Sequence, residues 1–370
     1  MRLRPRFSIP LLAYPLFAAC AGKGDTGDTA PTCDARAPEV ERIDVPTGYR
    51  TLDAPVMAPW LDEARTVPVG IWYPTDETSG HAATYIESFV DEASFEDAEL
   101  ADPAPGCRLP LVVYSHGSQA WGGNTSPLLR HLVAQGWVAA APDHLGNTLI
   151  DNVEPRSVSY SRTRVADIVA TIDALEALPA EDPLYGRVDT SRVLVMGHSF
   201  GGQTAWLLAG PTFDTEAIAA RCDAGAPGCT DAERASFDAP VADPRVVAVL
   251  PLDGFAGSDL VAAAGWATAD RPILFLSKAG DGDDEPFTTA AATDLTWARF
   301  DGACHETFTN SPIECATFDK EEGLTTTAAY LTAFASAQIL GLDAEPYAGI
   351  LDGRTVVDSR VTVSLSPGHD

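Results

Sequence analysis

The chain has 370 residues, of which 45% are hydrophobic, 8% aromatic and 21% charged. This composition excludes a disordered chain, a collagen-like chain and a miniprotein built only on disulfides, because it supplies enough apolar side chains for a large core. Lysines and arginines number 24 against 53 aspartates and glutamates, which gives a formal net charge of −29. That charge has the wrong sign for contact with a phosphate backbone, so we expect no nucleic-acid partner.

The N-terminus has the pattern of an export signal. Arg2, Arg4 and Arg6 precede the apolar stretch from Phe7 to Ala19. A helix of 13 residues is too short to span a hydrocarbon layer, which is about 30 Å thick. We therefore expect residues 1–19 to be a signal peptide that is removed, and not a membrane anchor.

The end of this stretch, Leu16-Phe17-Ala18-Ala19-Cys20, resembles the lipobox of bacterial lipoproteins, except that Phe17 stands where Leu is usual. The resemblance implies that Cys20 becomes acylated and N-terminal, and Ala21 favours the outer membrane of the cell envelope. Plain secretion with cleavage near Ala19 is the alternative. The small and polar residues that follow predict a flexible tether over residues 20–40.

The remaining cysteines fit an exported protein. Setting Cys20 aside leaves an even number, which suggests disulfides: Cys33, Cys107, Cys222, Cys229, Cys304 and Cys315. The near neighbours in sequence, Cys222 with Cys229 and Cys304 with Cys315, are the expected pairs, which leaves Cys33 for Cys107. No Cys-x-x-Cys or paired-histidine spacing is present, so we expect no metal site.

From about residue 66, short β-branched runs alternate with helical patterns, which predicts an α/β fold with a mostly parallel central sheet flanked by helices. The expected strands are 66–73, 111–115, 137–141, 192–196, 246–252, 273–277 and 296–300, with a late strand in 355–365. Helical spacing of apolar residues predicts helices over 165–178, 201–209 and 325–340. Insertions at 81–107 and 211–243 interrupt this order, and we expect a single domain over 41–370.

The strongest chemical signal is Gly197-His198-Ser199-Phe200-Gly201, which follows a β-branched run and precedes a helix-forming segment. This context is typical of a sharp strand-to-helix turn that exposes the serine and needs glycines on both sides. The N-terminus of the following helix favours developing negative charge. We therefore expect Ser199 to be a nucleophile.

A serine hydroxyl needs a base to accept its proton, and in folds with this turn the chain order is serine, then acid, then histidine. Five of the seven histidines precede Ser199 and His369 lies close to the C-terminus, which leaves His305. His305 follows the last expected core strand, and a Cys304–Cys315 disulfide would stiffen its loop.

The acid has two candidate positions. Asp253 follows the strand 246–252, at the carboxyl end where catalytic loops of α/β sheets belong. A second group, Asp281, Asp283 and Asp284, follows the next strand, but its spacing does not fit a calcium loop. We favour Asp253 and keep the second group as the alternative.

Two backbone N–H groups are expected to form an oxyanion hole. One belongs to Phe200, directly after the nucleophile. The other belongs to Ser118, in the segment Ser115-His116-Gly117-Ser118 that follows an earlier strand. Trp121, a few residues further on, either lines a substrate pocket or packs as an ordinary core side chain.

Together these residues resemble the serine esterases related to platelet-activating-factor acetylhydrolase and the bacterial "predicted dienelactone hydrolase" group, which have the α/β-hydrolase fold. The segments that carry the resemblance are 69–74, 113–117, 142–148, 197–202, 251–254 and 302–305. In the acetylhydrolases the acid follows the strand after the nucleophile helix, as Asp253 does, and the base lies in a Gly-x-x-His loop, as His305 does. The insertion at 211–243 and the second acidic group depart from that pattern. A true dienelactone hydrolase uses a cysteine, so Ser199 argues against that activity.

These observations predict an exported, lipid-anchored carboxylic-ester hydrolase that works through an acyl-enzyme and needs no cofactor. Short-acyl or other lipid esters are the first expected substrates, followed by simple or polymeric esters, since plant chlorophyllases and bacterial polyester hydrolases look similar at the serine turn. A serine peptidase or acyltransferase, and a surface-binding lipoprotein without chemistry, remain as alternatives. The sequence does not define the oligomeric state.

Overall fold

The computed structural model describes residues 38–61, 63–101, 106–241, 243–255, 257, 259–280, 287, 290 and 293–367. The expected signal peptide, the lipid site Cys20 and the cysteine Cys33 lie outside the described residues, as do Asp281, Asp283 and Asp284. Among the helices that the structure describes, none combines the length and apolarity needed to cross a membrane.

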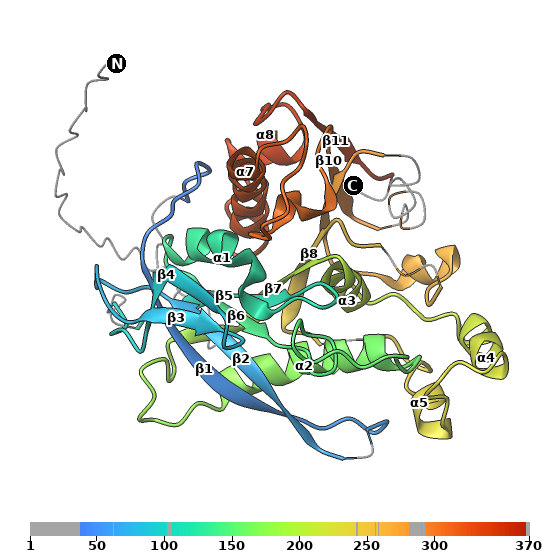
Figure 1. Ribbon diagram of the computed structural model, residues 1–370. Coiled ribbons are helices and arrows are strands. Elements are labelled where there is room, and N and C mark those ends of the chain that lie inside the picture. The colour runs from blue at the N-terminus through green and yellow to red at the C-terminus, as the bar shows by residue number, and fades with distance from the viewer. Residues whose placement is uncertain are drawn as a thin grey trace, which may run out of the picture.

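A mixed β-sheet forms the centre of the part of the chain that the structure describes. Its eleven strands lie in the order β11-β10-β9-β8-β7-β5-β6-β2-β1-β4-β3 (Figure 1). The strands are β1 Thr47–Val56, β2 Arg65–Tyr73, β3 Ala82–Tyr85, β4 Phe89–Glu96, β5 Leu109–Ser115, β6 Val138–Pro142, β7 Val188–His198, β8 Val246–Leu252, β9 Ile273–Lys278, β10 Leu295–Phe300 and β11 Val361–Leu365. The six neighbouring strands β10, β9, β8, β7, β5 and β6 run parallel to one another. At the two sides of this parallel block, β11 pairs antiparallel with β10 and β2 pairs antiparallel with β6.

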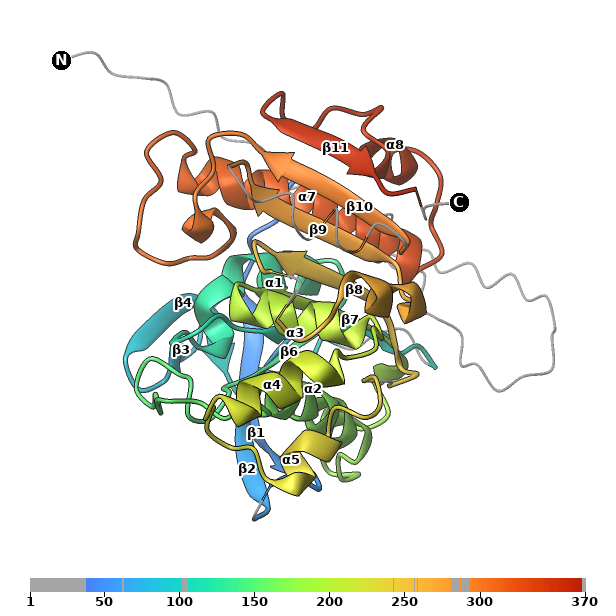
Figure 2. The same cartoon turned by 90° about the vertical axis from the view of Figure 1, so that its right-hand side faces the viewer.

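Helices cover both faces of this sheet (Figures 1 and 2). They are η1 Gly122–Thr125, α1 Ser126–Val133, α2 Tyr160–Glu176, α3 Phe200–Leu208, α4 Thr215–Asp223, α5 Asp231–Ala235, η2 Ala263–Thr268, η3 His305–Phe308, α7 Lys320–Gln338 and α8 Tyr347–Leu351. Successive strand residues alternate between the faces, so that Val193 and Val195 pack with α2 and α3, while Leu194 and Met196 pack with α1 and α7. The central strands are therefore buried on both sides, as parallel strands usually are.

The predicted strands and helices that follow residue 66 are confirmed in order and type. The late strand is β11, at Val361–Leu365, and the three predicted helices correspond to α2, α3 and α7. Helix α7 begins several residues earlier than predicted because Asp319 caps it, accepting hydrogen bonds from the N–H groups of Glu321 and Glu322.

The region before β5 contains more sheet than the sequence suggested. Strand β1 includes Gly48, Asp53 and Pro55, residue types that are depleted in strands, and it was not predicted. The acidic insertion at 81–107 contains the hairpin β3–β4, whose strand β4 pairs with β1 and so extends the sheet. Helix α1, which is short and has a proline in its first turn, was also not predicted.

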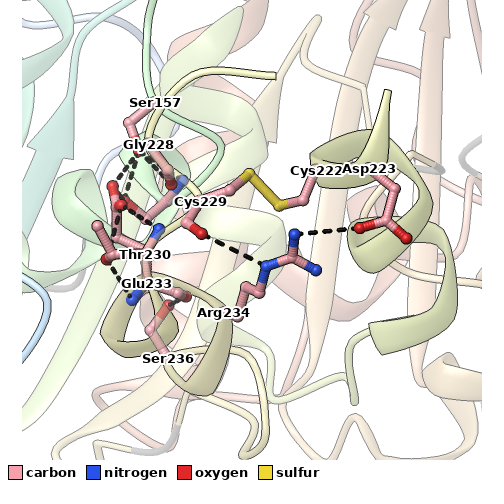
Figure 3. Close-up of a disulfide and its surroundings, with 10 residues drawn as sticks. Ser157, Cys222, Asp223, Gly228, Cys229, Thr230, Glu233, Arg234 and Ser236 are labelled. Carbon is pink, nitrogen blue, oxygen red and sulfur yellow. Dashed lines mark hydrogen bonds and ion pairs between the residues drawn. A yellow bond between two sulfur atoms is a disulfide. The ribbon is translucent and has the colours of Figure 1, made fainter. Parts of the chain in front are cut away.

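The insertion at 211–243 contains α4 and α5, which the Cys222–Cys229 disulfide links (Figure 3). Glu233 of α5 accepts hydrogen bonds from the hydroxyls of Ser157 and Ser159, just before α2. The insertion is thus attached to the segment that leads into α2.

Candidate active site

Ser199 lies at the sharp turn between β7 and α3. Its backbone has φ 57° and ψ −118°, a conformation that costs a non-glycine residue free energy and is typical of functional turns. A Cβ on Gly201 would lie 1.8 Å from the carbonyl oxygen of Ser115, and one on Gly197 would lie 2.1 Å from the carbonyl oxygen of Gly201. The two glycines of the motif are therefore required by close backbone packing.

The end of strand β8 lies directly against this turn. The N–H of Ser199 donates a hydrogen bond to the carbonyl of Leu252 at 2.9 Å. A Cβ on Gly254 would lie 2.5 Å from the carbonyl oxygen of Ser199. These contacts place Asp253, which stands between Leu252 and Gly254, next to the candidate nucleophile.

The carboxylate of Asp253 contacts the imidazole of His305. The distance between Oδ2 of Asp253 and Nδ1 of His305 is 2.5 Å, and Oδ1 accepts a hydrogen bond from the N–H of Lys278 at 3.1 Å. The side chain of Asp253 is 6% exposed and that of His305 is 42% exposed. The contact to Asp253 fixes the imidazole through Nδ1, so Nε2 is the ring nitrogen left to accept a proton.

Burial acts to lower the pKa of His305, but the hydrogen bond to Asp253 and its negative charge outweigh that effect. The net result is a pKa raised from the ordinary value of 6.5. A neighbouring carboxylate stabilises the imidazolium, which is the form that a general base reaches after it accepts a proton.

His198, directly before Ser199, contacts the loop of His305, a link that the sequence did not reveal. Its Nε2 lies 2.8 Å from the carbonyl oxygen of His305, and the two ring centroids are 4.5 Å apart. Burial, followed by the charge of His305, lowers the pKa of His198 to about 4, so its ring is neutral at pH 7 and can donate this hydrogen bond. Through this contact, the serine turn holds the backbone of His305.

The segment that follows β5 lies on the other side of Ser199. A Cβ on Gly117 would lie 3.2 Å from Cβ of Ser199, so this glycine allows the two loops to approach. Among the described residues, neither the N–H of Ser118 nor that of Phe200 bonds to a backbone carbonyl. The oxyanion hole expected from these two groups stays a prediction.

Trp121 packs against the hairpin of the first insertion. Its ring stacks on Phe89 of β4, with the centroids 4.0 Å apart, and its side chain is largely buried. The indole nitrogen of Trp121 is buried and has no hydrogen-bond partner among the described residues. The structure thus assigns Trp121 a packing contact, and contact with substrate stays a prediction.

Two of the expected disulfides are present. Cys304–Cys315 closes the loop that carries His305, and Cys222–Cys229 lies in the second insertion. Thr307 Oγ1 accepts a hydrogen bond from the N–H of Cys304 at 3.0 Å, which ties η3 to this disulfide. Cys107 forms no disulfide within the described part of the chain, and its expected partner Cys33 lies outside that part.

A buried polar network beneath the Ser115–Ser118 segment was not predicted. It consists of side chains from β2, from the loop after β6 and from α2, and includes Arg164 and Asp167. A signal was present in the sequence, because Arg164 and Asp167 are three residues apart on a helix and accompany Val165 and Ile168 on its apolar stripe. Charged residues on a buried stripe indicate a polar network within the core.

No protein-family model matches the chain. Chlorophyllase-1 of the chloroplast from Citrus unshiu is 26% identical over 109 residues, as is its counterpart from Citrus sinensis. Each match covers 30% of this chain and 31% of the length of the curated relative.

A solved structure similar to this one is the ferulic acid esterase from Streptomyces cinnamoneus. It is 20% identical with a TM-score of 0.60, and the match covers 87% of this chain and 97% of that one. Together with the mostly parallel sheet flanked by helices, this similarity shows that the chain has the α/β-hydrolase fold.

Proposed function

We propose that this chain is a serine carboxylic-ester hydrolase. The observation that carries the proposal is the Asp253–His305 contact beside a serine held in a strained strand-to-helix turn. Ser199, Asp253 and His305 each follow a parallel strand of the sheet, at the carboxyl ends where sites form in α/β folds. A nucleophile, a base and a group that orients the base are the parts that acyl transfer requires.

In the proposed reaction, Ser199 Oγ attacks the ester carbonyl while Nε2 of His305 accepts its proton. The tetrahedral oxyanion is stabilised by the N–H groups of Ser118 and Phe200. Its collapse breaks the bond to the alcohol, which takes the proton from His305 and leaves an acyl-enzyme. Water, deprotonated by the same imidazole, then releases the acid, and Asp253 orients and stabilises the imidazolium in both steps.

We propose esters with an apolar part as substrates. Leu149, Ile150 and Phe255 are large, exposed apolar side chains on loops that follow β6 and β8, at the edge of the sheet where Ser199 lies. The N–H of Leu149 donates to the carbonyl of Ala120, so this loop adjoins the candidate oxyanion segment. The net charge of −29 disfavours strongly anionic substrates.

Short-acyl phospholipid esters come first in this proposal, followed by simple and polymeric esters, in line with the resemblance to the acetylhydrolase group. The name of the ferulic acid esterase adds an aromatic-acid ester to the substrates to be compared. A panel that varies acyl length, with and without a phosphocholine head group, separates these classes by their kcat/KM values.

The direct test is hydrolysis of p-nitrophenyl acetate by the wild type and by Ser199→Ala, with circular dichroism to confirm that both are folded. We expect turnover by the wild type alone. An amide analogue tests peptidase activity, and an added alcohol acceptor tests acyl transfer. A folded wild type that turns over none of these substrates would contradict the proposal and favour a binding protein without chemistry.

We also propose that the protein is exported and held at the cell envelope by a lipid on Cys20. Two disulfides support an oxidising compartment. Growth of the producing cells with an alkynyl fatty acid should label the wild type but not Cys20→Ala. Equal labelling of the two proteins, or no labelling of either, would contradict the anchor.

A further inference from the structure

Arg164 is a fully buried arginine on α2, beneath the two loops that carry the proposed oxyanion donors. Burial lowers its pKa to about 10, so the guanidinium still carries its charge at pH 7. Its guanidinium donates to neutral acceptors, among them Thr204 Oγ1, Asn147 Oδ1, Ser115 Oγ and the carbonyl of His116. A buried charge costs free energy, so an arginine kept here without a directly bonded carboxylate calls for a functional reason.

One side of the guanidinium holds the segment that contains Ser118. Nη2 donates to the carbonyl of His116 and to Ser115 Oγ, the latter at 3.2 Å. Nη1 donates to Oδ1 of Asn147 at 2.9 Å, and Nδ2 of Asn147 donates to Ser118 Oγ at 3.1 Å. Arg164 therefore fixes this segment both at its backbone and, through Asn147, at the side chain of Ser118.

The other side of the guanidinium contacts the first turn of α3, which begins with Phe200. Nε donates to Thr204 Oγ1 at 3.2 Å, and the Thr204 hydroxyl donates to the carbonyl of Phe200 at 3.2 Å. The guanidinium carbon lies 4.6 Å from the centroid of the Phe200 ring, within the range of a cation–π contact. A single side chain thus contacts both loops that carry the two N–H donors.

A second layer of buried groups orients the partners of Arg164. Ser115 Oγ lies 2.9 Å from Nε2 of His144, and Nδ1 of His144 lies 2.7 Å from Oδ2 of Asp167. Burial lowers the pKa of His144 well below 6.5, so its ring is neutral. With Nδ1–H donating to Asp167, Nε2 accepts a hydrogen bond from the Ser115 hydroxyl. The oxygen of Ser115 is then free to accept from Arg164, and Arg65 pairs with the second oxygen of Asp167.

We propose that Arg164 is a positioning residue that sets the separation of the Ser118 and Phe200 N–H groups, so that both point at one oxyanion. This inference rests on the proposed ester hydrolysis and adds the group that preorganises its oxyanion hole. Donors that stabilise a developing charge must be in place before the charge forms, because reorganisation during the reaction would reduce their effect. Such donors act more strongly on the transition state than on the bound ester, so their displacement lowers kcat more than it raises KM.

The test compares Arg164→Lys with the wild type in kcat and KM for p-nitrophenyl acetate and in the inhibition constant of phenylboronic acid. The boronic acid forms a tetrahedral adduct with a catalytic serine and so reports the oxyanion hole. Lysine keeps the charge but loses the planar fork of donors. We expect kcat to fall by about 10²-fold, with a comparable loss of boronic acid affinity and KM within about twofold.

The matched control is Arg130→Lys. Arg130 is also a buried arginine, but it lies on α1 and pairs with Asp44 and Asp91. We expect this variant to lose thermal stability while kcat and boronic acid affinity stay within about twofold of the wild type. If Arg164→Lys does not fold, Asn147→Ala takes its place. This variant removes the hydrogen bond to Ser118, and it should also lose kcat and boronic acid affinity.

Three results would overturn the positioning role. The first is a wild-type kcat in folded Arg164→Lys, or in Asn147→Ala where that variant replaces it. The second is a loss of kcat in this variant without a loss of boronic acid affinity, and the third is an equal loss of kcat in Arg130→Lys. The proposed function is judged separately. A folded wild type without Ser199-dependent turnover contradicts the ester hydrolase itself, whereas an active wild type matched by Arg164→Lys contradicts only the role of Arg164.

Discussion

Two neighbouring groups of side chains each contain a serine, a histidine and an aspartate. One group is Ser115, His144 and Asp167, and the other is Ser199, His305 and Asp253. The two groups differ in burial and in the pKa of the histidine. The side chains of His144 and Asp167 are 0% exposed, whereas that of His305 is 42% exposed beside a nearly buried Asp253. Burial lowers the pKa of His144, whereas for His305 the effect of burial is outweighed by Asp253 and the pKa is raised. Residue identity alone therefore does not determine the exposure or the pKa of a histidine beside an aspartate.

The backbones of the two serines differ as well. Ser115 is the last residue of strand β5 and is fully buried, whereas Ser199 is half-buried in a turn with positive φ. The buried arrangement can hold neighbouring groups in place but cannot admit an ester. The half-exposed one can, and this contrast is what the following predictions test.

The largest expected effect separates the two serines. Ser199→Ala should lower kcat for p-nitrophenyl acetate by about 10⁶-fold, the order found when a triad nucleophile is removed. Ser115→Ala removes only one of several acceptors of Arg164, so we expect a loss of about tenfold or less. Steady-state kinetics of the two folded variants measure the difference, and similar losses in both would remove the distinction between the sites.

The next effect concerns the acid. Asp253→Asn should lower kcat by about 10⁴-fold, because an amide favours the wrong imidazole tautomer and does not stabilise the imidazolium. Asp281→Asn serves as the control and should keep kcat close to that of the wild type. The reverse outcome would transfer the role of the acid to the second acidic group.

The two histidines should also differ in their response to pH. In the proposed reaction, His305 must be neutral to accept the proton of Ser199, so protonation of the imidazole at low pH abolishes activity. Because the pKa of His305 is raised, kcat/KM should increase with pH, with the midpoint of the increase above pH 6.5. Imidazole NMR signals should show His305 titrating in that range while His144 stays neutral to well below it. A midpoint of kcat/KM at or below 6.5 would contradict the effect assigned to Asp253.

The smallest expected effect comes from the disulfides, one of which, Cys304–Cys315, closes the loop that carries His305. Replacing Cys304 and Cys315 by serine should lower the free energy of unfolding by about 2–3 kcal/mol. It should also reduce kcat several-fold because the loop of His305 becomes less well positioned. The paired replacement of Cys222 and Cys229 should affect stability alone, and chemical denaturation with parallel kinetics distinguishes the two variants.

Local patterns in the sequence were sufficient to predict the serine turn and most of the sheet. The turn is specified by glycines at fixed spacing, and the central strands are buried on both faces and therefore read as continuous apolar runs. The placement of Asp253 and His305 followed from chain order, because the carboxyl ends of parallel strands meet at one edge.

What the sequence did not reveal depends on contacts between distant segments. Strand β1 contains residues that disfavour strands, and its pairing with β2 and β4 determines its structure instead. The partners of Arg164 come from three separate segments, up to 49 residues away along the chain. No local pattern predicts which polar groups meet in a core, although charged residues on the apolar stripe of α2 show that such a meeting must occur.

Fluorophosphonate labelling followed by peptide mass spectrometry tests the central claim most directly, because the probe reacts only with an activated serine. We predict modification at Ser199 alone, absent in Ser199→Ala and greatly slowed in His305→Ala, with Ser115 unmodified. A folded wild type that remains unlabelled, or that is labelled at another serine, would contradict the account.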